Sequence, residues 1–317
     1  MSSTVPPVGA QHVSGHGASP APREGQTIVG TGRFVRYANF VKLPHTVFAL
    51  PFALVGVTLA SYSAPVSVAL VAWVVLAFTA ARFAAMGFNR IADAQIDARN
   101  PRTAMRELPA GAMSMTEAWG AVLLAVAVFE LAAFQLNGLC LALSPLAIAW
   151  VFFYSYTKRF TRWSHLVLGL GLGIAPVGGY LAISGSWSDP WWMLVALAAA
   201  VMCWTAGFDV FYALQDVEFD RANGLFSLPA KLGARESLIV ARVLHVATVV
   251  LLAAVGMATH AGALYGAGVA VAATLLAYEN SLVRADDISK VGRAFFTINM
   301  ALSSVFFAFV LAERLFR

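Results

Sequence analysis

Apolar stretches of about 20 residues recur along most of the chain and are separated by short polar segments. A helix of about 20 apolar residues crosses a hydrocarbon core of about 30 Å. The stretches are too long and too uniformly apolar for the alternating strands of a membrane barrel. The pattern therefore predicts an all-α, polytopic membrane protein with nine transmembrane helices, at residues 41–62, 67–92, 116–136, 139–157, 164–184, 190–213, 236–258, 261–283 and 295–315.

The first 33 residues have a different pattern. They are rich in Gly, Ser, Pro and Ala and contain no apolar run. Such a segment cannot bury enough apolar surface to fold, so we expect residues 1–33 to form a disordered tail. The tail also lacks the apolar region of a signal peptide. Residues 34–317 are expected to form a single transmembrane domain.

Composition agrees with a membrane protein and excludes several other classes. Of the 317 residues, 60% are hydrophobic and 12% are charged, whereas soluble domains carry about 25% charged residues. Cys140 and Cys203 both lie inside apolar stretches, without the spacing of a disulfide framework or a zinc site. The net charge of +5 is divided by membrane side and forms no basic face, so nucleic acid is excluded as a partner. The bilayer is the expected partner, and the oligomeric state is left open.

Most of the 21 basic residues lie before the first span or flank the loops after the second, fourth, sixth and eighth spans. The alternate loops, near 63–66, 137–138, 185–189 and 259–260, contain no Lys or Arg. Because basic loops remain in the cytoplasm, this alternation predicts a cytoplasmic N-terminus and a C-terminus on the opposite side.

Two acidic clusters occur at the cytoplasmic ends of the second and sixth spans. On continuous helices with 100° per residue, each cluster faces one way: Asn89, Asp93 and Asp97 fall within about 80°, and Asp209, Asp216 and Asp220 within about 40°. Clustered carboxylates repel one another and need a compensating cation. Mg²⁺ is the natural candidate, because it prefers carboxylate oxygens and completes its coordination with water and phosphate. Two clusters suit two ions that bridge a diphosphate.

Basic residues follow both clusters and close the fourth span. They are Arg102, Arg106, Lys158, Arg159 and Lys231. Guanidinium and ammonium groups beside acidic clusters are typical of a clamp for phosphate oxygens. Positive-inside topology alone would also place basic residues in these loops.

The ordered set of motifs resembles the UbiA superfamily of intramembrane aromatic prenyltransferases. The motifs are Asn89-x3-Asp93-x3-Asp97, Arg102-x3-Arg106, Tyr154-x3-Lys158-Arg159 and Asp209-x2-Tyr212-x3-Asp216-x3-Asp220. The resemblance implies a helical bundle around a central cavity that opens sideways to lipid. It also implies that the six residues of the two acidic motifs hold Mg²⁺, and that the basic residues with Tyr154 and Tyr212 bind the diphosphate of an isoprenoid donor.

By the same resemblance, the chain transfers a polyprenyl group from a polyprenyl diphosphate to a small aromatic acid similar to 4-hydroxybenzoate. The new bond forms at the ring carbon ortho to the hydroxyl, in quinone biosynthesis at a bacterial inner membrane. Arg90 and Glu107 depart from the common family pattern, which leaves a dihydroxynaphthoate of menaquinone synthesis as an alternative acceptor.

Two residues are candidates for binding the acceptor. Arg82 lies within a span and shares a face with Asn89 and Asp93, within about 40°. Intramembrane charges usually line cavities, so Arg82 is interpreted as an anchor for the acceptor carboxylate or as a partner for an acid or carbonyl of another helix. His45 is interpreted in the same way, as an acceptor contact or as an interhelical hydrogen bond.

A cation-coupled transporter is the competing function from another class. Intramembrane acids mark ion paths in transporters, where the binding residues lie near the midplane on broken helices. In this chain the acids lie at helix ends beside basic loops. Their position favours the enzyme.

Overall fold

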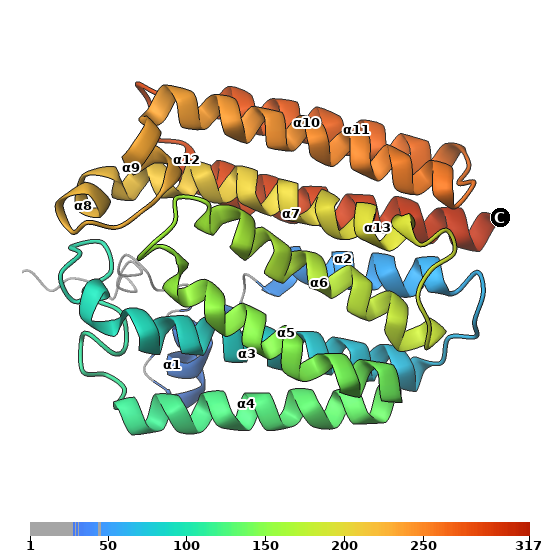
Figure 1. Ribbon diagram of the computed structural model, residues 1–317, viewed down its shortest axis with the longest axis horizontal. Helices are drawn as coiled ribbons and strands as arrows, with labels where there is room; N and C mark the ends of the chain where they lie inside the picture. The colour runs from blue at the N-terminus through green and yellow to red at the C-terminus, as the bar shows by residue number, and fades with distance from the viewer. Residues whose placement is uncertain (1–27, 29, 31, 44–45) are drawn as a thin grey trace, which may run out of the picture.

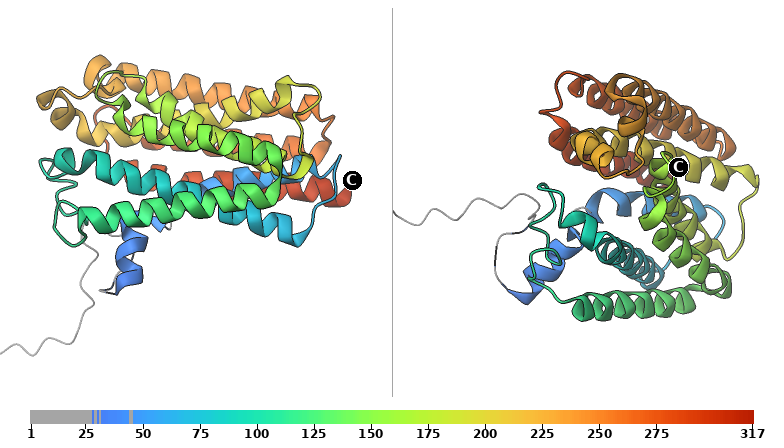
Figure 2. Two further views of the ribbon diagram at one scale, coloured as in Figure 1. Left: turned by 60° about the horizontal axis from the view of Figure 1, so that its bottom comes forward. Right: turned by 60° about the vertical axis from the view of Figure 1, so that its left-hand side comes forward.

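The computed structural model describes residues 28, 30, 32–43 and 46–317. Most of the expected tail and His45 lie outside these residues. The described part of the chain is helical, with one isolated β-bridge and no strand. It opens with a short helix, α1 (Arg33–Phe40), which stands apart from the bundle in Figure 2.

Nine helices in the described part of the chain correspond to the nine expected spans. They are α2 (Thr46–Ala60), α3 (Val68–Asp97), α4 (Met115–Leu136), α5 (Gly138–Thr157), α6 (Ser164–Ser184), α7 (Trp192–Ala213), α10 (Ala234–Ala258), α11 (Ala263–Leu282) and α13 (Asn299–Phe316). By length and composition, seven of the described helices can cross a bilayer, while α2 and α11 fall short of this measure. The expectation of an all-helical membrane fold is confirmed.

Short elements join the long helices at one end of the bundle. They are η2 (Leu214–Asp216), α8 (Val217–Ala222), α9 (Leu228–Leu232), α12 (Val291–Arg293) and η3 (Ala294–Ile298). The 3₁₀ turn η2 interrupts the helix on which the second acidic cluster was expected to form one continuous face. The expectation of an unbroken helix as far as Asp220 is therefore wrong, because the chain tightens at Leu214 before α8 begins.

The long helices lie roughly side by side, as Figure 1 shows, with α2 and α6 between α3–α5 and the group of α7, α10, α11 and α13. The largest buried side chains, including Phe52, Trp204 and Phe306, pack in this second group and against α2. Glycines allow α6 to approach its neighbours closely. A side-chain carbon at Gly56 would collide with the Pro176 carbonyl, and one at Gly169 with the Met202 carbonyl. The backbones of α2, α6 and α7 are therefore in direct contact.

Candidate active site

A cavity of about 660 Å³ lies among α2 to α7. Acidic and basic side chains line one end of the cavity, at the end of the bundle that carries α8 and α9 (Figure 1). Apolar side chains such as Phe129, Leu143 and Leu181 line the rest, as far as Trp187 in the loop at the opposite end. The cavity thus joins a polar end, where a charged group can bind, to an apolar body that suits a hydrocarbon chain.

The last two turns of α3 carry the first acidic cluster to the polar end. The amide of Asn89 donates to Asp93 Oδ2 at 3.0 Å. Asp93 also accepts from Arg159 at 3.2 Å, and Asp97 accepts from Arg106 at 2.7 Å. Each carboxylate of this cluster therefore has its own guanidinium partner, drawn from a loop at the polar end.

The second acidic cluster comes from α7, η2 and α8. Asp216 is buried and Asp220 is almost fully buried, while both still line the cavity. Lys158 at the end of α5 donates to Asp220 at 3.4 Å. Asp209, higher on α7, accepts from Nδ1 of His165 at 2.7 Å. The 3₁₀ turn changes the path of the chain, yet all three carboxylates reach the same cavity.

Arg102 ties the loop after α3 to the second cluster. It follows the first cluster in sequence, but its Nε donates to Asp216 of the second at 2.8 Å, and its Nη1 donates to the hydroxyl of Tyr212 at 2.8 Å. Asn100 donates to the same carboxylate at 3.2 Å. Although burial alone would lower it, the hydrogen bond and charge of Asp216 raise the pKa of Arg102 above its usual range. Arg102 therefore keeps its positive charge at the polar end.

Five carboxylates consequently have partners at the polar end, and we call them the paired acids: Asp93, Asp97, Asp209, Asp216 and Asp220. A second group, the unpaired cations, consists of Lys42, Arg82 and Arg90. All three line the cavity, and in the described part of the chain none forms an ion pair with a carboxylate.

Arg82 and Arg90 are held by uncharged groups at the end of α1, at the start of α2 and between the two helices. Arg82 donates to the Val41 carbonyl and to the Thr46 hydroxyl, both at 3.2 Å. Arg90 is 4% exposed and donates from Nε to the Phe40 carbonyl at 3.2 Å, while its buried Nη1 has no hydrogen-bond partner in the described structure. Unmatched positive charge facing an apolar cavity is costly, so it favours an anionic ligand.

The sequence pattern of the UbiA prenyltransferase family matches residues 49–305, which is most of the chain. The chain belongs to the UbiA prenyltransferase family. It is 31% identical to the 4-hydroxybenzoate octaprenyltransferase of Edwardsiella ictaluri over 73% of this chain and 79% of the relative. It is 35% identical to that of Vibrio cholerae (strain ATCC 39541) over 64% of this chain and 70% of the relative.

Solved UbiA structures have the same fold. The apo UbiA homologue of Aeropyrum pernix K1 is 36% identical and superposes with a TM-score of 0.77, covering 85% of this chain and 98% of the homologue. A UbiA homologue of Archaeoglobus fulgidus, bound to GPP and Mg²⁺, is 21% identical with a TM-score of 0.68, covering 88% and 99%. The chain is an integral membrane prenyltransferase, and the transporter alternative is set aside.

Most of the site residues expected from the sequence do line the cavity. Those lining it are Arg82, Asn89, Asp93, Asp97, Arg102, Arg106, Tyr154, Lys158, Arg159, Asp209, Tyr212, Asp216 and Asp220. Lys231 is not brought to it: its side chain is exposed, and its Nζ lies 4.2 Å from the ring centre of Phe226. His45 lies outside the described residues.

Sequence reasoning gave no role to Lys42, Arg90, Asn100 or His165. Arg90 departs from the family pattern, and its position inside the first acidic motif was itself a signal, whereas Lys42 has no acidic residue near it in sequence. Nothing in the sequence marked Asn100 or His165, because their partners lie 116 and 44 residues away. Contacts over such separations depend on how the helices pack.

The paired acids fit a hard divalent cation chemically. Among the described residues, no three His, Cys, Asp or Glu side chains converge closely enough to form a ready-made metal cage. Mg²⁺ requires only one or two carboxylates, since it usually keeps several waters and binds substrate phosphates. The polar end offers carboxylate oxygens and the Asn89 amide, all of them hard donors. The donor set therefore suits a cation that arrives with a diphosphate.

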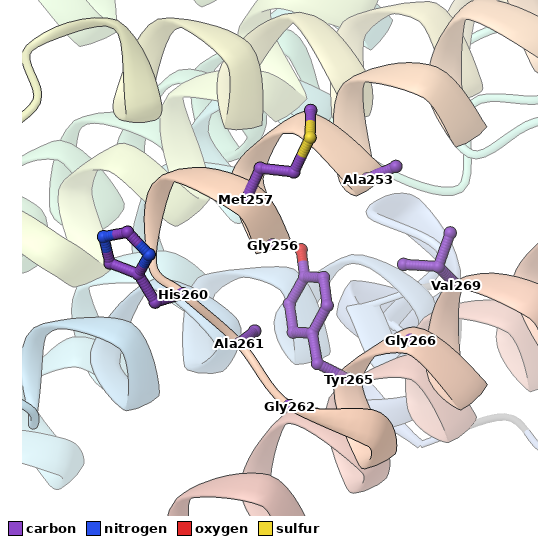
Figure 3. Close-up of a pocket in the computed structure, with 9 residues that line it drawn as sticks. All are labelled: Ala253, Gly256, Met257, His260, Ala261, Gly262, Tyr265, Gly266 and Val269. Atoms are coloured by element: carbon purple, nitrogen blue, oxygen red, sulfur yellow. The ribbon is translucent and has the colours of Figure 1, made fainter.

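A second pocket lies at the turn between α10 and α11 (Figure 3). It is lined by small and apolar residues with His260 and Tyr265. No acidic residue lines it, and the Tyr265 hydroxyl donates to the Leu252 carbonyl at 2.8 Å. This pocket therefore lacks the groups that a prenyl transfer needs.

Proposed function

We propose that this UbiA member transfers a polyprenyl group from a polyprenyl diphosphate to an aromatic acid similar to 4-hydroxybenzoate, at the carbon ortho to the hydroxyl. One observation carries the proposal: the paired acids and their cationic partners converge at one end of a cavity whose body is apolar. The 4-hydroxybenzoate octaprenyltransferases among its relatives support the acceptor and a long donor. The Archaeoglobus homologue bound to GPP and Mg²⁺ supports the diphosphate and the cation.

At the donor end, the paired acids would hold Mg²⁺, with Asn89, Asp93 and Asp97 on one side and Asp209, Asp216 and Asp220 on the other. When bound, Mg²⁺ supplies Lewis-acid stabilisation of the negative charge on the departing diphosphate. Arg102, Arg106, Lys158 and Arg159 bind the diphosphate oxygens, and Tyr154 and Tyr212 lie beside them. Two ions match the two clusters.

The reaction breaks the bond between the allylic carbon and the bridging oxygen, and the diphosphate leaves with the electron pair. The ring carbon ortho to the phenol then bonds to the allylic carbon, and loss of the ring proton restores aromaticity. The apolar cavity excludes water, which would otherwise trap the allylic cation as an alcohol.

At the acceptor end, Arg82 binds the carboxylate of the aromatic acid. Its guanidinium is held by Val41 and Thr46 and has no carboxylate partner in the described chain. Lys42 and Arg90 add positive charge on the same side of the cavity. We also propose that residues 34–317 form one catalytic domain in a bacterial inner membrane, with the N-terminus and the polar end on the cytoplasmic side.

The direct test incubates the purified protein with Mg²⁺, octaprenyl diphosphate and separate phenolic acids, followed by mass spectrometry of the products. We expect a prenylated 4-hydroxybenzoate and no product from benzoate, which lacks the activating hydroxyl. Prenylation of a dihydroxynaphthoate alone would instead assign the protein to menaquinone synthesis. No product from any phenolic acid would contradict an aromatic acceptor.

A further inference from the structure

We propose that His165 is a positioning residue that holds Asp209 as the fixed carboxylate of the metal site. The inference rests on the proposed function, since it assumes that the cavity binds a divalent cation together with a prenyl diphosphate. His165 lies in the first turn of α6, and its side chain is fully buried. It does not line the cavity itself, so it acts through Asp209.

Both ring nitrogens of His165 have partners. Nδ1 lies 2.7 Å from Asp209 Oδ2, and the Leu228 backbone N–H donates to Nε2 at 3.3 Å. A backbone N–H can only donate, so Nε2 must accept and the ring proton must be on Nδ1. A neutral imidazole therefore donates to Asp209, which leaves the carboxylate charge uncancelled.

The partners of the other paired acids are of a different kind. Arg102, Arg106, Lys158 and Arg159 have long side chains that are 18 to 38% exposed. Such side chains can turn from a carboxylate to a diphosphate without moving the backbone. His165 is short and buried and is held at both nitrogens, so it cannot make this exchange.

Asp209 is thereby prepared for a cation. One of its oxygens is held by His165, while the residue lines the cavity with a side chain that is 20% exposed. Hydrogen bonds that orient a metal ligand typically contribute about 10- to 100-fold to metal affinity. We expect the other carboxylates to exchange partners around this one fixed ligand.

His165 also ties Asp209 to the segment that closes the polar end. Leu228 begins α9, the Phe226 backbone N–H donates to the Lys158 carbonyl at 2.7 Å, and Leu225 lines the cavity. The two hydrogen bonds of His165 therefore serve different parts of the site. Substitutions that keep one and lose the other can separate their effects.

His165→Asn and His165→Gln form the test pair. The Asn amide nitrogen occupies the position of Nδ1 and can still donate to Asp209, whereas the Gln amide oxygen occupies that of Nε2 and can still accept from Leu228. Each variant loses one hydrogen bond, so both should lower the melting temperature by similar amounts. A role in general stability would affect cation binding equally in both.

The measurement is the affinity for Mn²⁺ in the presence of geranyl S-thiolodiphosphate, a slowly reacting donor analogue. Electron paramagnetic resonance monitors the binding. We expect His165→Gln to weaken Mn²⁺ binding by about 10- to 100-fold, and His165→Asn to remain within about threefold of the original protein. Asp209→Asn should weaken binding at least as much as His165→Gln.

His245→Asn is the matched control. His245 is the other deeply buried histidine of the described chain, is bonded to Asn280 and does not line the cavity, so its loss should leave Mn²⁺ affinity unchanged. Equal weakening in both His165 variants, or normal binding by His165→Gln or Asp209→Asn, would overturn the positioning role while the proposed function stands. If the unsubstituted protein bound no Mn²⁺ with the analogue, both proposals would fail.

Discussion

The paired acids and the unpaired cations line the same cavity but hold their charge in opposite ways. Four of the paired acids already have a cationic partner, such as Arg106 for Asp97, and must exchange it to bind a metal, whereas Asp209 accepts from the neutral His165. Among the described residues, Arg82 and Arg90 have only neutral oxygens as hydrogen-bond partners. Cationic partners neutralise four of the five paired acids before any substrate arrives, whereas Asp209 and the unpaired cations keep uncompensated charge. Under the proposed function, the donor and its metal would bind in the first region, that of the paired acids, and the acceptor carboxylate in the second, that of the unpaired cations.

Removing divalent cations should have the largest effect, because the paired acids depend on a metal for their proposed role. We expect EDTA to reduce prenyl transfer to background and added Mg²⁺ to restore it. The measurement is product formation by mass spectrometry before and after dialysis. A reaction that continued in EDTA would remove the reason for treating the acids as a metal site.

Asp93→Ala and Asp216→Ala should each lower kcat by about 10²- to 10³-fold or more, since each removes a central carboxylate and frees a guanidinium. Steady-state kinetics and a melting curve of the same preparation provide the measurement. Glu236→Ala is the control, because this exposed acid at the start of α10 does not line the cavity. Near-normal turnover in either aspartate variant would argue against the two-cluster arrangement.

Arg82→Leu tests the unpaired cations. Loss of a charge-assisted hydrogen bond worth about 1.5–3 kcal/mol should raise the acceptor KM about ten- to a hundredfold, with little change for the donor. Steady-state kinetics in which each substrate is varied in turn separates the acceptor KM from the donor KM. A purely structural Arg82 would instead lower thermal stability, by releasing Val41 and Thr46, and leave both KM values near normal.

Deprotonation of Lys42, which lies between α1 and α2, should have a smaller effect on substrate binding. Burial lowers the pKa of Lys42 from its ordinary 10.5 to about 8, and the cations Arg90, Arg106 and Arg102 act in the same direction while Tyr212 opposes them. Above pH 8 the side chain loses its charge, so the affinity of the protein for the anionic aromatic acid should fall about tenfold between pH 7 and pH 9.

The same titration should affect stability with the opposite sign. Because the unfolded chain binds more protons at Lys42 between pH 8 and 10.5, the contribution of this residue to stability rises with pH in that window. Lys42→Gln should weaken the pH dependence of both the affinity for the aromatic acid and the thermal stability, compared with the original protein. An unaltered pH dependence of substrate affinity in that variant would assign the effect to another group.

The helices and the first acidic face could be predicted from the sequence because both depend on local periodicity. Asn89, Asp93 and Asp97 lie on the cavity side of α3 as their spacing indicated. The pairing of Arg102 with Asp216 could not be predicted, since it requires the loop after α3 to fold onto the end of α7.

Dependence on helix packing also explains the other differences between the structure and the sequence-based expectations. Lys231 follows the second cluster in sequence, but α9 directs it away from the cavity and over Phe226. The 3₁₀ turn at Leu214–Asp216 contains no Pro or Gly, the residues that would have indicated a break in the helix. The sequence does not single out His165, because it is brought to Asp209 only by the packing of α6 against α7.

The glycine contacts of α6 have a consequence for how the cavity can be adapted to other substrates. Because Gly56 and Gly169 bring three backbones together, a larger residue at either position would force whole helices apart. Side chains at the far end of the cavity, such as Cys140 and Leu143, carry no such constraint. We expect variation in prenyl length to be achieved on the α5 side, by exchange of side-chain volume, while the α2–α6–α7 side remains an invariant scaffold.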